Sequence, residues 1–156
     1  MRMAPALKRL EIELDHSLSE GGEQRLIFEQ EHPGLDSVAL SYTNYLDEAE
    51  RFTSRRKNLT LLEGNAEEIA VKDHYFDIVT SIYLFHELPP KIREKVAAEI
   101  SRVLKPGGLF VFVDSLQYGD VAGDYDALLE LFPKRFHEPF YKSYAKTDLP
   151  RLFEKS

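Results

Sequence analysis

The segment from residue 99 to residue 114, EISRVLKPGGLFVFVD, constrains the fold of this chain more than any other part of its sequence. It begins as the last turns of an amphipathic helix that is expected over residues 89–104. Pro106 prevents the helix from continuing, and the glycine pair after it allows the backbone to turn directly into a strand. Residues 109–113 are apolar without alternation, which is typical of a parallel strand buried on both faces. The segment therefore predicts a helix, a sharp turn and a central strand.

Strand and helix patterns alternate from residue 37 onward, which predicts an α/β fold with a doubly wound, mostly parallel sheet. The N-terminal third is less regular, but the alternation around Leu10 and Ile12 predicts a strand, then a loop over residues 17–23 and a short helix over residues 24–31. We therefore expect a single domain over residues 1–156, in which residues 1–36 hold the first strand–helix unit. The expected strands are residues 37–42, 59–62, 76–85 and 109–113, and the expected helices are residues 43–52, 89–104, 125–132 and 148–154.

Composition and charge argue against several classes of function. The 156 residues, 43% of them hydrophobic, suffice to bury a core. The net charge of −7 argues against a nucleic acid as the main partner, because phosphate binding depends on Lys and Arg. No apolar run approaches the roughly 18 residues of a membrane span, and the N-terminus lacks the apolar region of a secretory signal. A cytoplasmic protein without membrane contact is therefore expected.

Metal and disulfide chemistry have little support in the sequence. The chain has no cysteine, and its five histidines are scattered without the His-x-x-x-His spacing of a helical metal site. A GxxxxGK phosphate loop and a Gly-x-Ser-x-Gly nucleophile turn are also missing from the sequence. We therefore predict no metal ligands.

Two segments resemble those of class I S-adenosylmethionine-dependent methyltransferases. RVLKPGG with its following apolar strand resembles the segment before the family's fifth strand, and FDIVTSIYLFHELP over residues 76–89 resembles its FDxV strand and the His-containing turn. The resemblance extends over residues 37–156. It implies a Rossmann-like, mostly parallel sheet of about five strands flanked by helices, with S-adenosylmethionine as the cofactor and a small molecule as the methyl acceptor. The family's C-terminal hairpin has no match in the chain, so we expect an unpaired strand edge and a homo-oligomer.

The resemblance also implies residues that contact the cofactor. Gly64, Asn65 and Ala66 resemble the family's GDAE segment after the third strand, where the second residue accepts a hydrogen bond from the adenine amino group. A plain Gly-Asn turn explains the same residues equally well. Tyr83, near the carboxyl end of the strand over residues 76–85, is implied to lie close to the sulfonium.

Two cofactor-binding features of the family are altered in this chain. Asp15 corresponds to an acidic residue after the first strand, but HSLSEGG has two adjacent glycines in place of the spaced set, and an ordinary exposed turn is the favoured interpretation. The position of the ribose-binding acid falls on Leu40 or Ser41. A serine hydroxyl makes a neutral hydrogen bond there, without a charge-assisted pair worth about 1.5–3 kcal/mol per bond. We therefore expect the affinity for the cofactor to fall about tenfold to a hundredfold.

The turn that follows residues 76–85 holds the candidate catalytic residues. His86 and Glu87 are implied to lie on the acceptor side of the site, and a histidine can accept a proton at neutral pH. An equally favoured alternative is that His86 is a structural residue of the turn, paired with a neighbour. Methyl transfer itself depends mainly on the alignment of donor and nucleophile.

Two other functions compete with methyl transfer. The first is a non-catalytic, methyltransferase-like subunit, which the altered glycine loop and the missing ribose acid favour. The second is a nicotinamide-binding Rossmann protein. It would need spaced glycines after the first strand and an acid after the second, and the sequence has neither.

Overall fold

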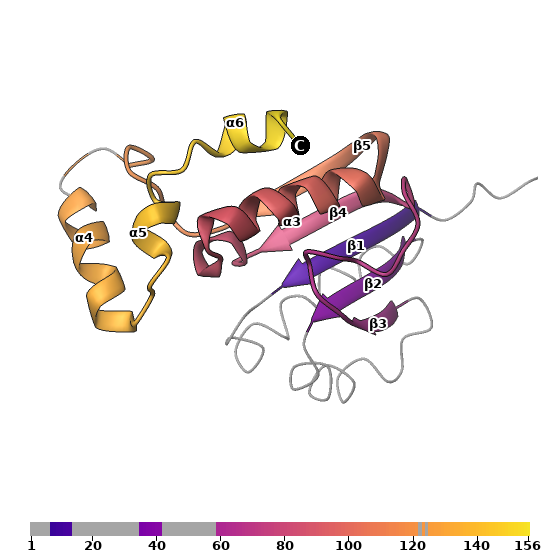
Figure 1. Ribbon diagram of the computed structural model, residues 1–156, viewed down its shortest axis with the longest axis horizontal. Helices are drawn as coiled ribbons and strands as arrows, with labels where there is room; N and C mark the ends of the chain where they lie inside the picture. Colours follow the sequence, from indigo (N-terminus) through magenta and orange to yellow (C-terminus); the bar gives the residue numbers. More distant parts are fainter. Residues whose placement is uncertain (1–6, 14–34, 42–58, 122, 124) are drawn as a thin grey trace, which may run out of the picture.

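The computed structural model describes residues 7–13, 35–41, 59–121, 123 and 125–156 of the chain, and for residues 7–13 and 35–41 it describes the backbone. Five strands form one sheet in the order β3-β2-β1-β4-β5, and every pairing is parallel (Figure 1). The strands are β1 (Leu7–Glu13), β2 (Leu35–Ser41), β3 (Leu59–Glu63), β4 (Phe76–Ile82) and β5 (Leu104–Val113). The predicted Rossmann-like α/β class is confirmed, as is the strand expected around Leu10.

The strand order reverses between β1 and β4. The chain runs outward from β1 to β2 and β3, and then returns to place β4 on the other side of β1. Glu13 at the end of β1 pairs with Ile82 at the end of β4. In a parallel sheet of this kind, ligands bind outside the carboxyl ends of the strands at the point of reversal.

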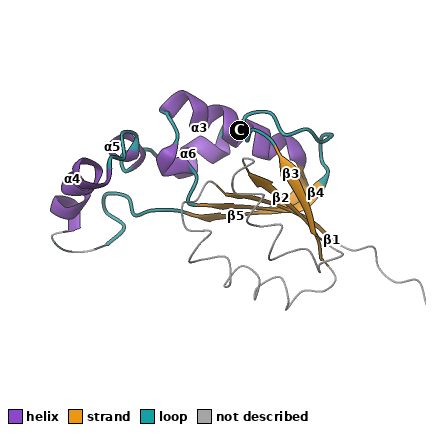
Figure 2. Cartoon of the chain, turned by 90° about the horizontal axis from the view of Figure 1, so that it is seen from below, coloured by secondary structure: helices purple, strands orange, loops and turns teal. Residues whose placement is uncertain are grey.

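Helices cover one face of the sheet and the region beyond its carboxyl edge. Figure 2 shows α3 (Pro90–Val103) and α6 (Leu149–Glu154) over one face. Figure 1 shows α4 (Tyr125–Phe136) and α5 (Tyr141–Tyr144) beyond the arrowheads of β1 and β4. A 3₁₀ turn, η1 (Phe85–Glu87), connects β4 to α3. None of the helices in the described part of the chain is long and apolar enough to cross a membrane.

Helix α3 forms where the periodicity predicted it, within one residue at each end. Pro90 occupies its first turn, where a missing N–H costs nothing, and the helix ends at Val103. Its buried face contacts the main hydrophobic core, in which each fully buried aliphatic or aromatic side chain contributes about 1.5–3 kcal/mol. The most buried core residues are Phe76, Val79, Leu84, Phe85, Val96, Val103 and Tyr144.

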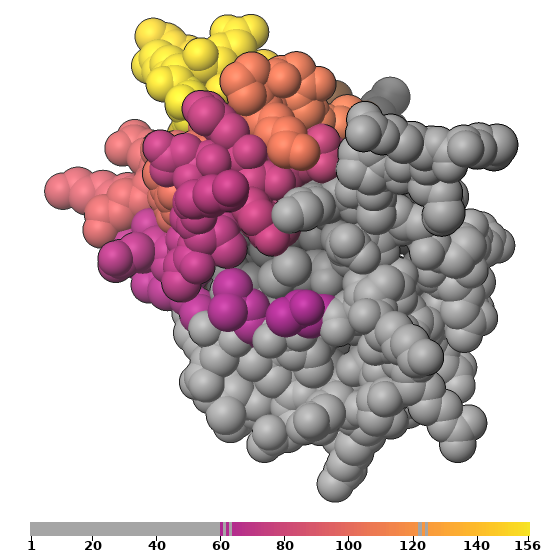
Figure 3. Space-filling view, turned by 90° about the vertical axis from the view of Figure 1, so that its right-hand side faces the viewer, coloured from indigo at the N-terminus to yellow at the C-terminus, as the bar shows by residue number. Residues whose placement is uncertain are grey.

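The Lys-Pro-Gly-Gly segment lies inside β5 rather than before it. Phe76 pairs with Leu104 and Ile78 pairs with Leu109, so the four intervening residues of β5 bulge out of the ladder. Gly107 permits this with a φ of 77°, a backbone conformation that glycine adopts without strain. Figure 3 shows the bulge, in orange, on the surface beside the yellow C-terminal residues.

The prediction that β4 and β5 are parallel neighbours is confirmed, but the prediction of a central β5 buried on both faces is wrong. Among the described residues, β5 is one of the two edge strands of the sheet, and β3 is the other. Phe110 and Phe112 pack against the core, whereas Leu109 is 57% exposed and Val113 is 43% exposed. The continuous apolar pattern does not distinguish a covered strand from an edge strand, because the exposure of a strand depends on which elements pack beside it.

Other boundaries were predicted less well. The strand expected over residues 76–85 ends at Ile82, because the chain turns sharply at Tyr83, and the helix expected over residues 125–132 continues through Pro133 to Phe136. Helix α5 was not predicted. The helices expected over residues 24–31 and 43–52, and the loop over residues 17–23, lie outside the described residues.

Candidate functional site

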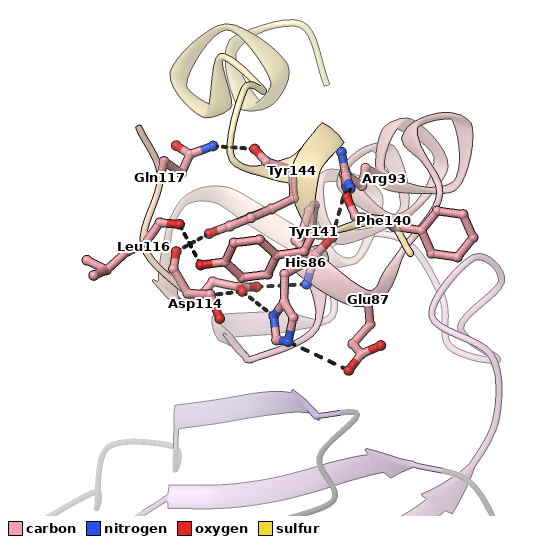
Figure 4. Close-up of polar contacts among 11 residues, drawn as sticks. His86, Glu87, Arg93, Asp114, Leu116, Gln117, Phe140, Tyr141 and Tyr144 are labelled. Carbon is pink, nitrogen blue, oxygen red and sulfur yellow. Dashed lines mark hydrogen bonds and ion pairs between the residues drawn. The ribbon is translucent and has the colours of Figure 1, made fainter. Parts of the chain in front are cut away.

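A histidine–aspartate pair lies at the carboxyl edge of the sheet, beside the point of strand reversal. His86 is in η1, just after β4, and Asp114 directly follows β5. The Nδ1 atom of His86 is 2.6 Å from Oδ1 of Asp114 (Figure 4). A carboxylate only accepts hydrogen bonds, so Nδ1 carries the proton and donates it, and Nε2 is left on the opposite edge of the ring.

The carboxylate of Asp114 is fully buried and held by backbone donors. Its side chain is 0% exposed, and it accepts hydrogen bonds from the backbone N–H groups of Phe85 and Ser115, each at 2.7 Å. These bonds fix the carboxylate in the orientation that receives His86. Sequence reasoning missed Asp114 as a site residue, although its position directly after an apolar strand is where such sites form.

The surroundings of His86 favour its charged form. Burial of the imidazole opposes protonation, but the hydrogen bond and negative charge of Asp114, with smaller effects of Glu138 and Glu87, outweigh burial and raise the pKa of His86. His86 is therefore a stronger base than a free histidine.

Two further carboxylates lie close to the imidazole, and that of Glu87 is on its Nε2 side. Nε2 of His86 lies 3.7 Å from Oε1 of Glu87, beyond hydrogen-bond distance, and Nε2 makes no hydrogen bond within the described part of the chain. Ligand atoms of His86, Glu87 and Glu138 all lie within 4.8 Å of one another. In Figure 4 the Nε2 edge and Glu87 point toward the strands of the sheet. The structure thus brings together the two predicted catalytic residues and adds Glu138, which no sequence signal indicated.

Tyrosine rings surround the imidazole. The ring centroids of Tyr83, Tyr141 and Tyr144 lie 6.3, 6.0 and 6.1 Å from that of His86, all in edge-to-face arrangements. The hydroxyl of Tyr141 donates to the carbonyl of Leu116, and that of Tyr144 donates to the carbonyl of Ser115. Burial raises the pKa of both Tyr141 and Tyr144, so both remain neutral. Their rings, rather than their hydroxyls, define the walls beside His86.

A buried arginine fixes α5 over η1. Arg93 of α3 is 1% exposed and donates from Nε to the carbonyl of Phe85 and from Nη2 to the carbonyl of Phe140, both at 2.9 Å. It also donates to the hydroxyls of Ser143 and Thr147. Through these bonds α3 positions the two elements that carry His86 and the tyrosine rings.

Tyr83 turns the chain at the end of β4. Its φ is 51°, which is uncommon for a residue with a side chain, and its N–H donates to the carbonyl of Val113 at 2.8 Å. The residue is 44% exposed. It thus lies at the carboxyl edge of the sheet beside His86, and whether it contacts a cofactor there stays a prediction.

The Gly64, Asn65 and Ala66 segment follows β3 at the same edge of the sheet. Asn65 is exposed, and its Oδ1 accepts a hydrogen bond from the backbone of Glu67 at 2.9 Å. In this turn the side-chain carbonyl of the exposed Asn65 retains a second lone pair, which can accept a hydrogen bond from another donor. The hydrogen bond also fits the plain Gly-Asn turn that the sequence left open.

The ribose and methionine ends of the predicted cofactor site are described less fully. Ser41 is the last residue of β2, where its backbone pairs with that of Glu63, and it brings no carboxylate. Asp15 and the glycine pair near it lie outside the described residues. The described residues therefore fit S-adenosylmethionine in two respects: an amide acceptor at Asn65 for the adenine, and an exposed ring at Tyr83 beside the point of strand reversal.

Comparison with known proteins agrees with this geometry. Residues 20–112 match the sequence model of a family described as "Methyltransferase domain". The ubiquinone/menaquinone biosynthesis C-methyltransferase UbiE of Vibrio vulnificus is 29% identical over 113 residues, covering 70% of this chain and 43% of that protein. Demethylmenaquinone methyltransferase of Staphylococcus carnosus is 30% identical over 86 residues, covering 54% and 35%. The chain spans less than half the length of these curated relatives.

Solved structures show the same fold. A protein of Bacillus halodurans C-125 assigned to the methyltransferases superposes with a TM-score of 0.72 at 22% identity, covering 98% of this chain and 63% of the other. Phosphoethanolamine N-methyltransferase 2 of Haemonchus contortus, solved in complex with S-adenosyl-L-methionine, superposes with a TM-score of 0.65 at 20% identity, covering 99% and 33%. With the family match over more than half of its length, the chain belongs to the methyltransferase-domain family, the class I methyltransferases that use S-adenosylmethionine as cofactor.

Proposed function

We propose that this protein transfers a methyl group from S-adenosylmethionine to a small-molecule acceptor, with the His86–Asp114 pair as the proton acceptor. One observation carries the proposal: a buried imidazole is held at 2.6 Å by Asp114, and its Nε2 faces the carboxyl edge of the sheet without a hydrogen bond in the described residues. A histidine that only stabilised the turn would need the hydrogen bond to Asp114 but not a free Nε2. A proton acceptor requires it.

The cofactor supplies a methyl group already activated on a sulfonium, so the chain has three tasks: to bind, to align and to accept a proton. Asn65 and Ala66 are suited to the adenine and Tyr83 to the neighbourhood of the sulfonium. His86 takes the proton of the acceptor at Nε2, and Asp114 stabilises the imidazolium that forms. Arg93 keeps α5 in place over this pair, which excludes water from one side.

Cofactor affinity is expected to be low. Ser41 replaces the acid that would accept charge-assisted hydrogen bonds from the ribose, and loss of backbone donors in the altered glycine loop weakens binding further. The loss of binding free energy from these missing hydrogen bonds corresponds to a dissociation constant of about 100 μM or higher.

Calorimetric titration with S-adenosylhomocysteine, followed by transfer of labelled methyl groups to a panel of small amines, phenols, alcohols and carboxylates, tests the proposal. We expect binding, methylation of at least one acceptor class, and a loss of turnover of about 10²–10⁴-fold in His86→Gln with little change in S-adenosylhomocysteine affinity. His74→Asn is the matched control, because this exposed histidine precedes β4 at the opposite edge of the sheet and has a φ of 54° that asparagine tolerates.

A non-catalytic, methyltransferase-like subunit is the second candidate, favoured by the serine at position 41. It predicts that the chain binds S-adenosylhomocysteine weakly or not at all and that no acceptor is methylated, with or without His86.

A further inference from the structure

Most of the exposed large hydrophobic side chains in the described part of the chain belong to α4 and the segment before it. They are between 39% and 62% exposed: Leu116, Val121, Tyr125, Leu128, Leu131 and Phe136. Single exposed apolar residues are common on soluble proteins, but apolar residues gathered on one element mark an interaction surface. Helix α4 therefore carries a candidate interaction surface.

The two faces of α4 have different surroundings. The inner face packs against α5, since Leu129 is 6% exposed and the ring of Phe132 lies 4.9 Å from that of Tyr141. Positions three or four residues apart lie on the same side of a helix. The opposite side, here called the outer face of α4, is therefore formed by Tyr125, Leu128, Leu131 and Arg135. Leu128 and Leu131 are each 57% exposed, and Arg135 is also exposed, so this face is largely open to solvent.

The position of α4 in the molecule leaves room for a partner. Figures 1 and 2 both show α4 at one end of the molecule, with α5 between it and the other helices. The outer face thus points away from the sheet. Two copies of the chain can bring these faces together while their sheets remain apart.

The outer face is complementary to itself when two α4 helices run antiparallel. A two-fold axis between positions 128 and 131 places Leu128 of each copy against Leu131 of the other, so that four leucines form the centre of the contact. The same register places Arg135 of each copy near Tyr125 of the other. A guanidinium over an exposed aromatic ring is stabilised by about 0.5–1 kcal/mol. A parallel pair would place Arg135 beside Arg135 and lose these contacts.

The charges along α4 favour the same partner. Its first turn carries Asp126, whereas its last turn carries Lys134 and Arg135. In an antiparallel pair the basic end of each helix lies at the acidic end of the other, and the two helix dipoles also run in opposite directions. An anionic lipid surface would attract the basic end of α4 but repel the acidic end. The charge distribution therefore favours a second copy of the chain over a membrane.

We infer that two copies of this chain associate through the outer faces of their α4 helices, packed antiparallel about a two-fold axis. The inference goes beyond the proposed function, because the outer face includes neither His86 nor Asp114. The contact is small, since each copy contributes one side of a helix of 12 residues. Interfaces below about 1,000 Å² are weak, so we expect a dissociation constant of about 10–100 μM.

Sedimentation equilibrium between about 5 and 500 μM tests the contact. The measurements use the Val113→Lys background, in which a charge on the exposed edge strand β5 opposes association through that strand. Leu128→Lys should weaken association at least about tenfold, because it brings two charges to the apolar centre of the contact. Ala98→Lys is the control, because it introduces the same side chain at an exposed position of α3, and it should change nothing.

Exchange of charges tests the orientation of the two helices. Tyr125→Lys should weaken self-association about tenfold, because the new lysine faces Arg135 of the other copy. Arg135→Glu should also weaken it, because the cation is lost from both ends of the contact. An equimolar mixture of the two variants should associate about as tightly as the parent chain, because the new lysine of one then faces the new glutamate of the other. Only the antiparallel register predicts this recovery.

Three results would overturn the inference: a monomer at about 500 μM, association that Leu128→Lys leaves unchanged, or no recovery in the mixture. Vesicles of phosphatidylcholine and phosphatidylglycerol provide the competing test. Vesicle binding that Leu128→Lys abolishes, without self-association of the parent chain, would assign the outer face to a lipid surface instead. Thermal unfolding shows whether each variant is folded, and Leu131→Lys takes the place of Leu128→Lys if that variant is not.

Discussion

His86 and Asp114 meet because β4 and β5 are parallel neighbours in register. Ile82 pairs with Val113 at the ends of the two strands, and Nδ1 of His86 lies 2.6 Å from Oδ1 of Asp114, which is 28 residues further along the chain. Parallel pairing brings the carboxyl ends of both strands to one edge, so a residue shortly after one strand reaches a residue directly after the other.

Asp114→Asn should lower both the pKa of His86 and the turnover number. The N–H groups of Phe85 and Ser115 donate to different oxygens of Asp114, and the amide keeps only one acceptor oxygen for them. The amide also cannot attract a proton to the imidazole, so burial then dominates and the pKa of His86 falls below its ordinary value. NMR titration of the imidazole resonances measures the pKa, and turnover should fall at least about tenfold. An unchanged pKa would contradict the role given to Asp114.

The stability of the folded protein should depend on pH through His86. Its folded-state pKa is raised above the ordinary value, so its contribution to the free energy of unfolding is fully present below about pH 6.5 and is lost as pH rises through the folded-state pKa. Urea unfolding at a series of pH values measures this slope. In His86→Gln the slope above pH 6.5 should flatten, and an identical slope in both proteins would show that other groups produce it.

Arg93→Met should destabilise the protein by about 2–4 kcal/mol, because it leaves the carbonyls of Phe85 and Phe140 without their donor in a buried position. The loss should be accompanied by release of α5, which limited proteolysis between α4 and α6 would detect. Arg151→Met, at an exposed position of α6, is the control and should change the free energy of unfolding by less than about 0.5 kcal/mol. A loss of stability in the control equal to that in Arg93→Met would contradict the assignment.

Ser41→Asp should restore part of the cofactor affinity. A carboxylate at the end of β2 adds charge-assisted hydrogen bonds to the ribose and should tighten S-adenosylhomocysteine binding about tenfold to a hundredfold in calorimetric titration. Ser41→Asn keeps an acceptor without the charge and serves as the comparison. If neither variant binds more tightly, the assignment of residue 41 to the ribose position is wrong.

We propose that the chain associates with itself through the edge of β5. Within the part of the chain that the structure describes, the outer edge of β5 has no strand beside it, and Leu109 and Val113 are exposed on this strand. Such an edge invites pairing with another chain. Sedimentation equilibrium at tens of micromolar should show a dimer or larger species, and Val113→Lys should shift it toward the monomer. A monomeric wild-type protein would contradict the proposal.

The sequence by itself determined the β4–α3–β5 unit. Its information is local: the spacing of Ile92, Val96 and Ile100 along one helix face, Pro90 at the helix start, and two strongly apolar strands joined by a crossover of helical length. These features fix element type and order without reference to distant residues. His86 and Glu87 were identified through the resemblance of residues 76–89 to the FDxV strand and the His-containing turn of the methyltransferases.

Only the tertiary structure decided the chemistry of the site and the exposure of β5. Strand register and the position of α5 bring Asp114, Arg93 and Glu138 close to His86. Local periodicity of the sequence reveals neither the register nor the position of α5. The exposure of Leu109 depends on the place of its strand in the sheet order, which an apolar pattern does not specify. Side chains far apart in sequence act together only where packing brings their atoms within a few ångströms, and packing is a property of the whole fold.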